Sequence, residues 1–503
     1  MNKTVLLNKN LIVQYLEKPA AEFTRDDIVR FIIDNEIEMV NFMYPAEDGR
    51  LKTLNFIIND LDYLETILTT GERVDGSSLF SFIEAGSSDL YVMPRFSTAF
   101  VDPFAEIPTV AMLCSFFDKD GNPLASSPEM TLKKACDEFR SATGLEFCAM
   151  GELEYYVITP EETDFPARDQ KGYHESAPFA KLNDFRATCM RYVAQTGGQI
   201  KYGHSEVGNF VLDGFNWEQN EIEFLPVAAE LAADQLILAK WVIRNLAYNM
   251  GLNVTFAPKI TPGKAGSGLH IHMKLTRNGS NVMLDEDLKL SKDARRLIAG
   301  LMTMAPSLTA FGNTNPTSYF RLVPHQEAPT NICWGDRNRS VLVRVPLGWT
   351  TSNDMCHVAN PLTPPSKFDA AQKQTIEIRS GDCSADVHYY LAGLAVAARL
   401  GFEMTEADAL QVAEKNYVDV NIHRAENAAR LATLNSLPTS CVTSADALLQ
   451  QRDLYEKLGV FSPGVIDRTI EKLRNYNDVG LCQEATANPE LMAELIKAYF
   501  HCG

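Results

Sequence analysis

The sequence of 503 residues lacks the features of a membrane or secreted protein. Its most apolar window, from Leu231 to Leu252, contains Asp234, Lys240 and Arg244, whereas a membrane span needs about 20 apolar residues without such interruptions. The apolar stretch near the N-terminus is broken by polar residues, and no small-residue cleavage site follows it. We therefore expect neither membrane insertion nor a secretion signal.

Basic residues and paired cysteines are also scarce. Lys and Arg number 46 against 65 Asp and Glu, which gives a formal net charge of -19. This acidic balance argues against a nucleic-acid partner, because such partners are bound by basic patches. The ten cysteines contain no CxxC pair, which favours reduced thiols in a cytoplasmic protein over a disulfide framework or a zinc site. No repeat or low-complexity tract stands out.

Turn signals divide the chain into a small N-terminal part and a large remainder, with the boundary at 118–123. Thr24, with Asp27 three residues later, predicts a capping box that opens a helix. The segments MVNFMY, LKTLNFII and TVAMLCSFF predict strands of a small sheet. Further elements are expected as a helix at 132–141, the strand EFCAMGELEYYVI, helices at 228–248 and 386–405, and C-terminal helices with N-caps at Ser444, Ser462 and Asn488.

Four strand-like segments share an alternation of polar and apolar residues. They are Glu152-Leu153-Glu154, Glu221-Ile222-Glu223, His270-Ile271-His272 and Glu377-Ile378-Arg379. Because side chains alternate across a strand, each polar pair points to one face and the aliphatic residue to the other. If the strands are neighbours, the gathered carboxylates require cations between them. Many carboxylates with a single imidazole suit Mg²⁺ or Mn²⁺ better than zinc. For any one pair, the alternative is a solvated strand face.

Arginines lie in two segments downstream of this alternation. SYFRLVPHQEAP contains Arg321 and the loop residue Glu327, and GDRNRSVLVRV contains Arg339 and Arg344. A guanidinium group matches phosphate and carboxylate oxygens and stays charged at any working pH. These arginines are therefore candidates for binding anionic substrates, with surface ion pairs as the alternative.

These motifs occur together, in order, in a known family. MGELEYYVI, GHSEVGNF, EQNEIEF, GSGLHIHM, NPTSYFRLVPHQEAP, RNRSVLVRVP and IEIRSGDCSAD resemble the type I glutamine synthetase family, and DGSSLFSFIEAGSSDLYVMP and FVDPF resemble its N-terminal domain. The resemblance implies an α+β fold, with a small β-grasp domain at 24–120 and a catalytic domain at 121–503. In the latter, an antiparallel sheet lines the active site and the C-terminal region is helical. The resemblance also implies a ring-shaped homo-oligomer, a dodecamer, with active sites between subunits.

The chemistry implied by the resemblance is that of a glutamate–ammonia ligase. ATP phosphorylates the γ-carboxylate of glutamate, and ammonia then displaces phosphate to give glutamine. Two or more Mg²⁺ or Mn²⁺ ions are implied per site, the first on Glu154, Glu206 and Glu221 and the second on Glu152, His270 and Glu377. The resemblance further implies ATP binding by His272, Arg339 and Arg344, and a catalytic role for Arg339. It implies glutamate binding by Arg321, Arg379 and Gly266. Tyr173 is implied to border an ammonium pocket, and Glu327 is implied to be a flap residue and proton acceptor.

The sequence departs from the family pattern around the amine and the glutamate. Ala46 stands where the family has an aspartate that helps to deprotonate ammonium, and the adjacent Glu47 could substitute if the loop turns. Lys264-Ala265 replaces an Asp-Asn pair before GSG, which removes an amide expected near bound glutamate. Lys274 replaces a common serine close to the nucleotide. The acceptor and glutamate subsites are thus where this chain is expected to differ.

Loop lengths differ as well, and three functions stay open. About seven extra residues lie between Glu206 and Glu221, and NPTSYFR is shorter than the usual motif. ATLNSLPTS lacks the tyrosine that many bacterial members adenylylate, so regulation by adenylylation is not expected.

The complete metal set favours a glutamine synthetase that uses ammonia. Ala46 and the insertion favour a γ-glutamyl ligase for a larger amine, such as a polyamine or ethanolamine. A non-catalytic structural or regulatory homologue is the third hypothesis.

Overall fold

The computed structural model describes residues 3–83, 88–324, 328–349, 353–366 and 369–503. Its N-terminal part is built on a six-stranded sheet in the order β2-β1-β6-β4-β3, with β5 paired to β6. β1 runs parallel to β6 and the other pairings are antiparallel. The strands are β1 (Met39–Pro45), β2 (Leu51–Ile57), β3 (Glu72–Asp75), β4 (Asp89–Pro94), β5 (Phe100–Val101) and β6 (Thr109–Phe117).

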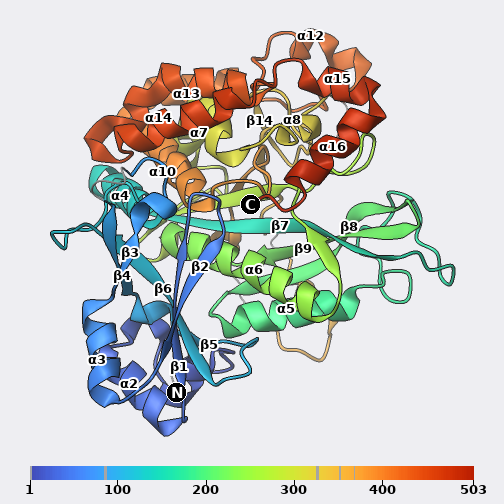
Figure 1. Ribbon diagram of the computed structural model, residues 1–503. Coiled ribbons are helices and arrows are strands. Elements are labelled where there is room, and N and C mark those ends of the chain that lie inside the picture. The colour runs from blue at the N-terminus through green and yellow to red at the C-terminus, as the bar shows by residue number, and fades with distance from the viewer. Residues whose placement is uncertain (1–2, 84–87, 325–327, 350–352, 367–368) are drawn as a thin grey trace.

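Two helices cover this sheet, at the lower left of Figure 1. The predicted capping box is confirmed, because the Thr24 hydroxyl accepts from Asp27 N and the Asp27 carboxylate accepts from Thr24 N at the start of α2 (Arg25–Asp34). α3 (Leu61–Thr70) is capped by Asp60. The preceding α1 (Leu11–Leu16) buries Ile12 in the same apolar core. The N-terminal domain, expected to be a β-grasp domain, is thus a sheet with helices packed on it.

The larger sheet has ten strands and crosses the centre of the molecule (Figure 1). Its main order is β14-β15-β16-β12-β7-β9-β8, antiparallel except for β14 and β15. The strands are β7 (Glu146–Pro160), β8 (Ile200–Leu212), β9 (Phe215–Phe224), β10 (Val227–Ala228), β11 (Asn253–Thr255), β12 (Leu269–Arg277), β13 (Ser280–Asn281), β14 (Trp334–Asp336), β15 (Val343–Val345) and β16 (Ile376–Ile378).

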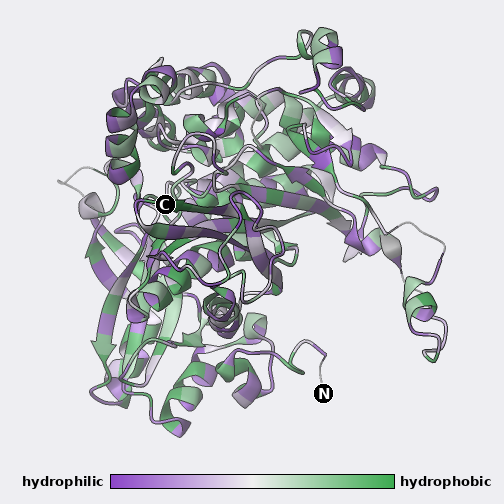
Figure 2. Cartoon of the chain, turned by 90° about the vertical axis from the view of Figure 1, so that its right-hand side faces the viewer, coloured by the Kyte–Doolittle hydropathy of each residue, from purple (hydrophilic) through white to green (hydrophobic). Residues whose placement is uncertain are grey.

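The four alternating segments lie on adjacent strands of this sheet, β16, β12, β7 and β9, so the condition for a shared polar face is met. Leu153, Ile222, Ile271 and Ile378 are all fully buried in the main apolar core. The polar residues between them consequently face the opposite side. In Figure 2, bands of hydrophobic and hydrophilic residues alternate along the strands. A continuous aliphatic face therefore supports a continuous polar face.

Helices form the layer behind the aliphatic face. α6 packs across β7, and α10 lies against α4 and α7. The helices in this region are α4 (Pro128–Thr143), α5 (Asn183–Gln195), α6 (Ala229–Asn249), α7 (Lys292–Gly312), α8 (Ser318–Arg321), α9 (Met355–Ala359) and α10 (Val387–Glu403). The predicted helices at 132–141, 228–248 and 386–405 correspond to α4, α6 and α10.

The C-terminal region is helical, as expected, and lies at the top of Figure 1. It contains α11 (Glu406–Lys415), α12 (Ala428–Leu431), α13 (Cys441–Glu456), α14 (Pro463–Asn475), α15 (Leu481–Ala487) and α16 (Pro489–Tyr499). Ser462 and Asn488 are N-caps, as predicted. The predicted cap at Ser444 is wrong, because Ser440 forms a capping box with Thr443 one turn earlier and Ser444 is buried inside α13.

Two composition-based expectations can be compared with the structure. All ten cysteines are free thiols and most are buried, as expected for small core residues. Within the described ranges, no helix combines the length and the apolar composition that a membrane span requires.

Candidate functional site

The register of the large sheet sets the polar residues opposite one another. The facing pairs are His270 with Glu152, His272 with Glu377, and Glu154 with Glu221. They line a cavity of about 820 Å³. The same cavity is lined by the other predicted site residues, namely Tyr173, Glu206, Gly266, Arg321, Arg339, Arg344 and Arg379. Glu327 lies outside the described residues, and its role stays a prediction.

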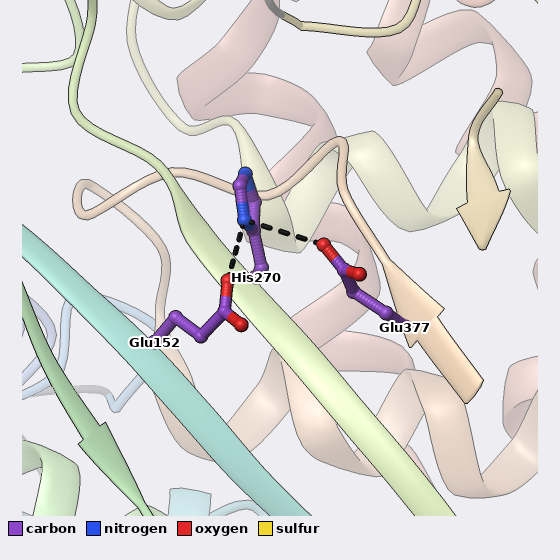
Figure 3. Close-up of side chains that lie close together, drawn as sticks. All are labelled: Glu152, His270 and Glu377. Carbon is purple, nitrogen blue, oxygen red and sulfur yellow. Dashed lines mark hydrogen bonds and ion pairs between the residues drawn. The ribbon is translucent and has the colours of Figure 1, made fainter. Parts of the chain in front are cut away.

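The predicted second metal group is assembled around His270. Its Nδ1 lies 2.8 Å from Glu152 Oε2 and 3.5 Å from Glu377 Oε1, and Figure 3 shows both carboxylates turned toward the imidazole. The donor atoms of the three residues lie within 4.8 Å of one another, as a single ion requires. Burial acts to raise the pKa of Glu152, but His272 and His270 outweigh it and hold that pKa well below its usual value.

The predicted first metal group is only partly assembled. Glu206 and Glu221 come together, but the third residue within 4.8 Å is His204. In the part of the chain that the structure describes, Glu154 belongs to no such group. Its Oε2 instead accepts from Gly268 N at 2.7 Å and from Gln219 Nε2 at 3.1 Å.

His204 is a residue that the sequence analysis missed. Its Nδ1 faces Ser205 O at 3.0 Å, and its Nε2 lies 3.4 Å from Glu221 Oε1. If Nδ1 carries the proton toward the carbonyl, Nε2 keeps a lone pair on the side of the carboxylates. His204 lies two residues before Glu206, so the period of a strand could have indicated that both face the same side.

Negative charge accumulates around Glu221. Burial raises the pKa of this carboxyl well above its usual value, and repulsion from Glu152, Glu154 and Glu206 adds to the effect. A divalent cation among these oxygens would offset both effects. The donor set therefore fits a metal on electrostatic grounds.

A third cluster shares Glu152 with the group around His270. Glu223 lies with Glu152 and His272 so that one donor atom from each is within 4.8 Å of the others. Glu223 Oε1 accepts from Lys201 Nζ at 2.5 Å, whereas its buried Oε2 has no hydrogen-bond partner of ordinary geometry among the described residues. Glu223 belongs to one of the alternating segments, and no role is predicted for it from the sequence.

Two of the four predicted arginines are paired with Glu377. Arg344 Nη1 and Arg379 Nε each donate to Glu377 at 3.0 Å. Arg321 is buried, and donates to Ser380 O at 3.0 Å. The backbone oxygen of Arg339 accepts a hydrogen bond from Arg379 Nη1. Four arginines thus line the cavity, where a polyanion would meet them.

Aromatic rings form the wall on the side of Tyr173. Tyr173 is 49% exposed and stacks on His174, with ring centroids 4.1 Å apart. The centroid of the His174 ring lies 4.4 Å from that of His204, and the Tyr202 ring lies 5.8 Å from the His204 ring. The cavity thus has a cationic wall and a largely aromatic wall.

Ala46 and Glu47 lie on the N-terminal domain. Ala46 is buried. Glu47 accepts from Ser81 N at 2.7 Å and from Arg468 Nε at 3.2 Å. Burial acts to raise the pKa of Glu47, and the bonds from Ser81 and Arg468 outweigh it and lower that pKa. These contacts occupy the carboxylate, so the structure does not favour Glu47 as the substitute for the missing aspartate.

Comparison with known families gives two matches that together span most of the chain. Residues 36–119 match the model described as "Glutamine synthetase, beta-Grasp domain". Residues 125–479 match the model described as "Glutamine synthetase, catalytic domain".

Curated relatives and solved structures give concordant results. Glutamine synthetases of Mycolicibacterium smegmatis and Staphylococcus epidermidis are each 28% identical, covering 90% of this chain and 95% of the relative. A Plasmodium falciparum glutamine synthetase superposes with a TM-score of 0.73 at 20% identity, over 91% of this chain and 96% of its own. A protein named GmaS, solved with ADP, has a TM-score of 0.72 at 18% identity, over 92% and 99%.

Proposed function

Because the chain belongs to the glutamine synthetase family, we propose that this glutamate–ammonia ligase, or closely related glutamate–amine ligase, uses ammonia as its acceptor. The products are then glutamine, ADP and phosphate, formed through γ-glutamyl phosphate. The observation that carries the proposal is the convergence of six predicted metal-position side chains and four arginines on one cavity. Relatives named glutamine synthetase over 90% of the chain also support it.

The carboxylate clusters are the proposed metal positions. Glu152, His270 and Glu377 would hold one divalent ion, and Glu206 and Glu221 another, with His204 in reach and Glu154 beside them. Bound Mg²⁺ or Mn²⁺ would neutralise phosphate oxygens and the charge that develops during phosphoryl transfer. Burial and the neighbouring carboxylates raise the pKa of Glu221, and a divalent ion bound there would offset both effects.

The arginines and His272 are assigned to the two anionic substrates. Arg339, Arg344 and His272 would hold the phosphates of ATP, while Arg321 and Arg379 would hold glutamate near Gly266. Arg344 and Arg379 are paired with Glu377. Substrate anions would therefore compete with Glu377 for the two guanidinium groups, and a bound metal would compete with the guanidinium groups for the Glu377 carboxylate. Orienting two polyanions in this way is the main contribution of the protein to phosphoryl transfer.

Two residues are assigned to the second step. Glu327 would shield the acyl phosphate from water and accept a proton from the attacking nitrogen, the role implied by the family motif. Tyr173 would border the acceptor.

A larger amine is the second candidate acceptor. The observation that favours it is the aromatic wall of Tyr173, Tyr202 and His204, together with Ala46 at the position of the family aspartate. Aromatic faces stabilise alkylammonium groups through cation–π contacts. A bulky amine held there would not depend on the missing carboxylate for its binding.

A phosphate-release assay discriminates the candidates. The enzyme is supplied with ATP, glutamate and Mg²⁺, and with ammonium, ethanolamine or a polyamine in turn. We expect release with ammonium. Preference for ethanolamine or a polyamine would instead support the second candidate. Folded protein that binds ATP but releases no phosphate with any of the amines would overturn both.

A further inference from the structure

The two residues that replace the family's Asp-Asn pair both contact one loop. Lys264 Nζ forms an ion pair with Asp169 Oδ2 at 2.6 Å, and Ala265 N donates to Gln170 Oε1 at 2.7 Å. The resemblance implies a carboxylate and an amide at 264 and 265, whereas this chain has a carboxylate and an amide at Asp169 and Gln170. A carboxylate and an amide thus face positions 264 and 265 from the neighbouring loop.

The loop is fixed against β8 by regularly spaced backbone bonds. Gln170 N donates to Asn209 O at 2.9 Å, Gly172 N to Val207 O at 3.3 Å, and a further bond follows two residues later. Gly172 lies so close to β8 that an added Cβ would be 2.4 Å from Glu206 O. The loop is therefore anchored beside a predicted metal ligand.

The backbone of Gln170 is held in an unusual conformation. Its φ is 55°, in the left-handed region that residues other than glycine rarely adopt. Such conformations persist where the surroundings fix them, and they cluster at functional sites. The side chain leaves this backbone at the wall of the main cavity, next to Ala265 and Gly266.

One end of the Gln170 amide has no partner. Its oxygen accepts from Ala265 N, which identifies the other end as the NH₂ group. That nitrogen, Nε2, is buried and has no hydrogen-bond partner within the described ranges. A buried donor without an acceptor is costly, and a ligand acceptor would satisfy it.

We propose that Gln170 is a glutamate-binding residue whose amide replaces, from the facing loop, the amide lost at Ala265. This inference rests on the proposed function. The donor would reach a carboxylate oxygen of the amino-acid substrate, near the position assigned to Gly266 and Arg321. The Arg321 side chain lies beside Gly266, since a Cβ added there would be 3.1 Å from Arg321 Cγ.

Glutamate affinity measured by isothermal titration calorimetry, with ADP and Mg²⁺ present, tests the proposal. Gln170→Glu keeps an oxygen for Ala265 N but removes the NH₂ donor. A hydrogen bond to a charged group is strong enough that its loss should raise the Kd for glutamate at least about tenfold. Gln170→Ala should weaken binding too, and adding Ala265→Asn to that variant should restore most of the affinity.

Asp169→Asn is the matched control, because it breaks the neighbouring ion pair in the same loop and leaves Gln170 in place. It should leave the Kd for glutamate within about twofold. The proposal would be overturned if Gln170→Glu bound glutamate with wild-type affinity, or if Asp169→Asn weakened binding as much as Gln170→Glu. It would also be overturned if Ala265→Asn did not restore binding in Gln170→Ala. If the unaltered enzyme itself bound no glutamate, the proposed function would fail instead.

Discussion

At the scale of single residues, charge is neutralised unevenly across the site. Glu377 is paired with Arg344 and Arg379, and Glu152 lies between the two histidines of β12. Glu221, in contrast, has mainly other carboxylates around it, and its pKa is raised. The protein therefore supplies part of the neutralising charge around Glu152 and Glu377 itself, whereas the side of Glu206 and Glu221 depends more on a bound metal.

His204 is expected to contribute to metal binding on that second side. Replacing it by glutamine removes an imidazole whose Nε2 lies 3.4 Å from Glu221, so the affinity for Mn²⁺ should fall about tenfold or more. Mn²⁺ titration followed by electron paramagnetic resonance measures this change. His174→Gln is the control, because His174 stacks on the same rings without belonging to a donor group. Equal affinities in both variants would contradict the assignment.

At the scale of elements, a buried ion pair connects the two domains. Arg95 follows β4 in the N-terminal domain, and its two terminal nitrogens bond both oxygens of Asp234 on α6, at 2.7 and 2.8 Å. His388 on α10 lies 3.4 Å from the same carboxylate. Burial acts to raise the pKa of Asp234, but Arg95 and His388 outweigh it and lower the pKa to about 2. The contact thus joins β4, α6 and α10.

Breaking this pair should cost considerable stability. Asp234 is buried and Arg95 is partly buried, so Asp234→Asn should lower the free energy of unfolding by at most about 3–5 kcal/mol, the range for a fully buried pair. Denaturant unfolding at neutral pH measures the loss. Asp120→Asn, which removes the exposed partner of Lys119, should change little. Comparable losses in the two variants would show that the buried pair does not join the domains energetically.

The same carboxyl group gives this contact a defined pH dependence. In the unfolded chain Asp234 should titrate near the ordinary value of about 3.9, above its folded value of about 2. The contribution of Asp234 to stability is therefore present at pH values above its pKa in the unfolded chain, and it is lost as the pH falls through its pKa in the folded protein. The difference in unfolding free energy between the natural chain and Asp234→Asn should accordingly shrink between neutral pH and pH 2.

At the scale of the whole molecule, we propose that the chain assembles into a ring-shaped dodecamer with sites between subunits. The cavity lining is partly exposed in the single chain, with Tyr173 49% exposed, and Ala46 and Glu47 of the N-terminal domain do not line it. In the implied ring, a neighbouring subunit would close the open side.

Light scattering after size-exclusion chromatography tests the assembly. We expect a mass of twelve chains, and activity that is lost when dilution or mild denaturant dissociates the particle. A fully active monomer would contradict both the ring and the shared site. The acidic composition, with its net charge of -19, should make the assembly sensitive to low salt because like-charged subunits repel one another.

The sequence by itself determined the chemistry of the polar face. Since side chains alternate along a strand, Glu152, His270 and Glu377 had to share a face once their strands paired, and the motifs identified the family. The tertiary structure alone decided which residues meet across long separations. His204 joins the carboxylates, Gln170 meets Ala265, and Glu47 is bonded to Arg468. These contacts depend on strand order and loop packing between distant segments, which local periodicity cannot specify.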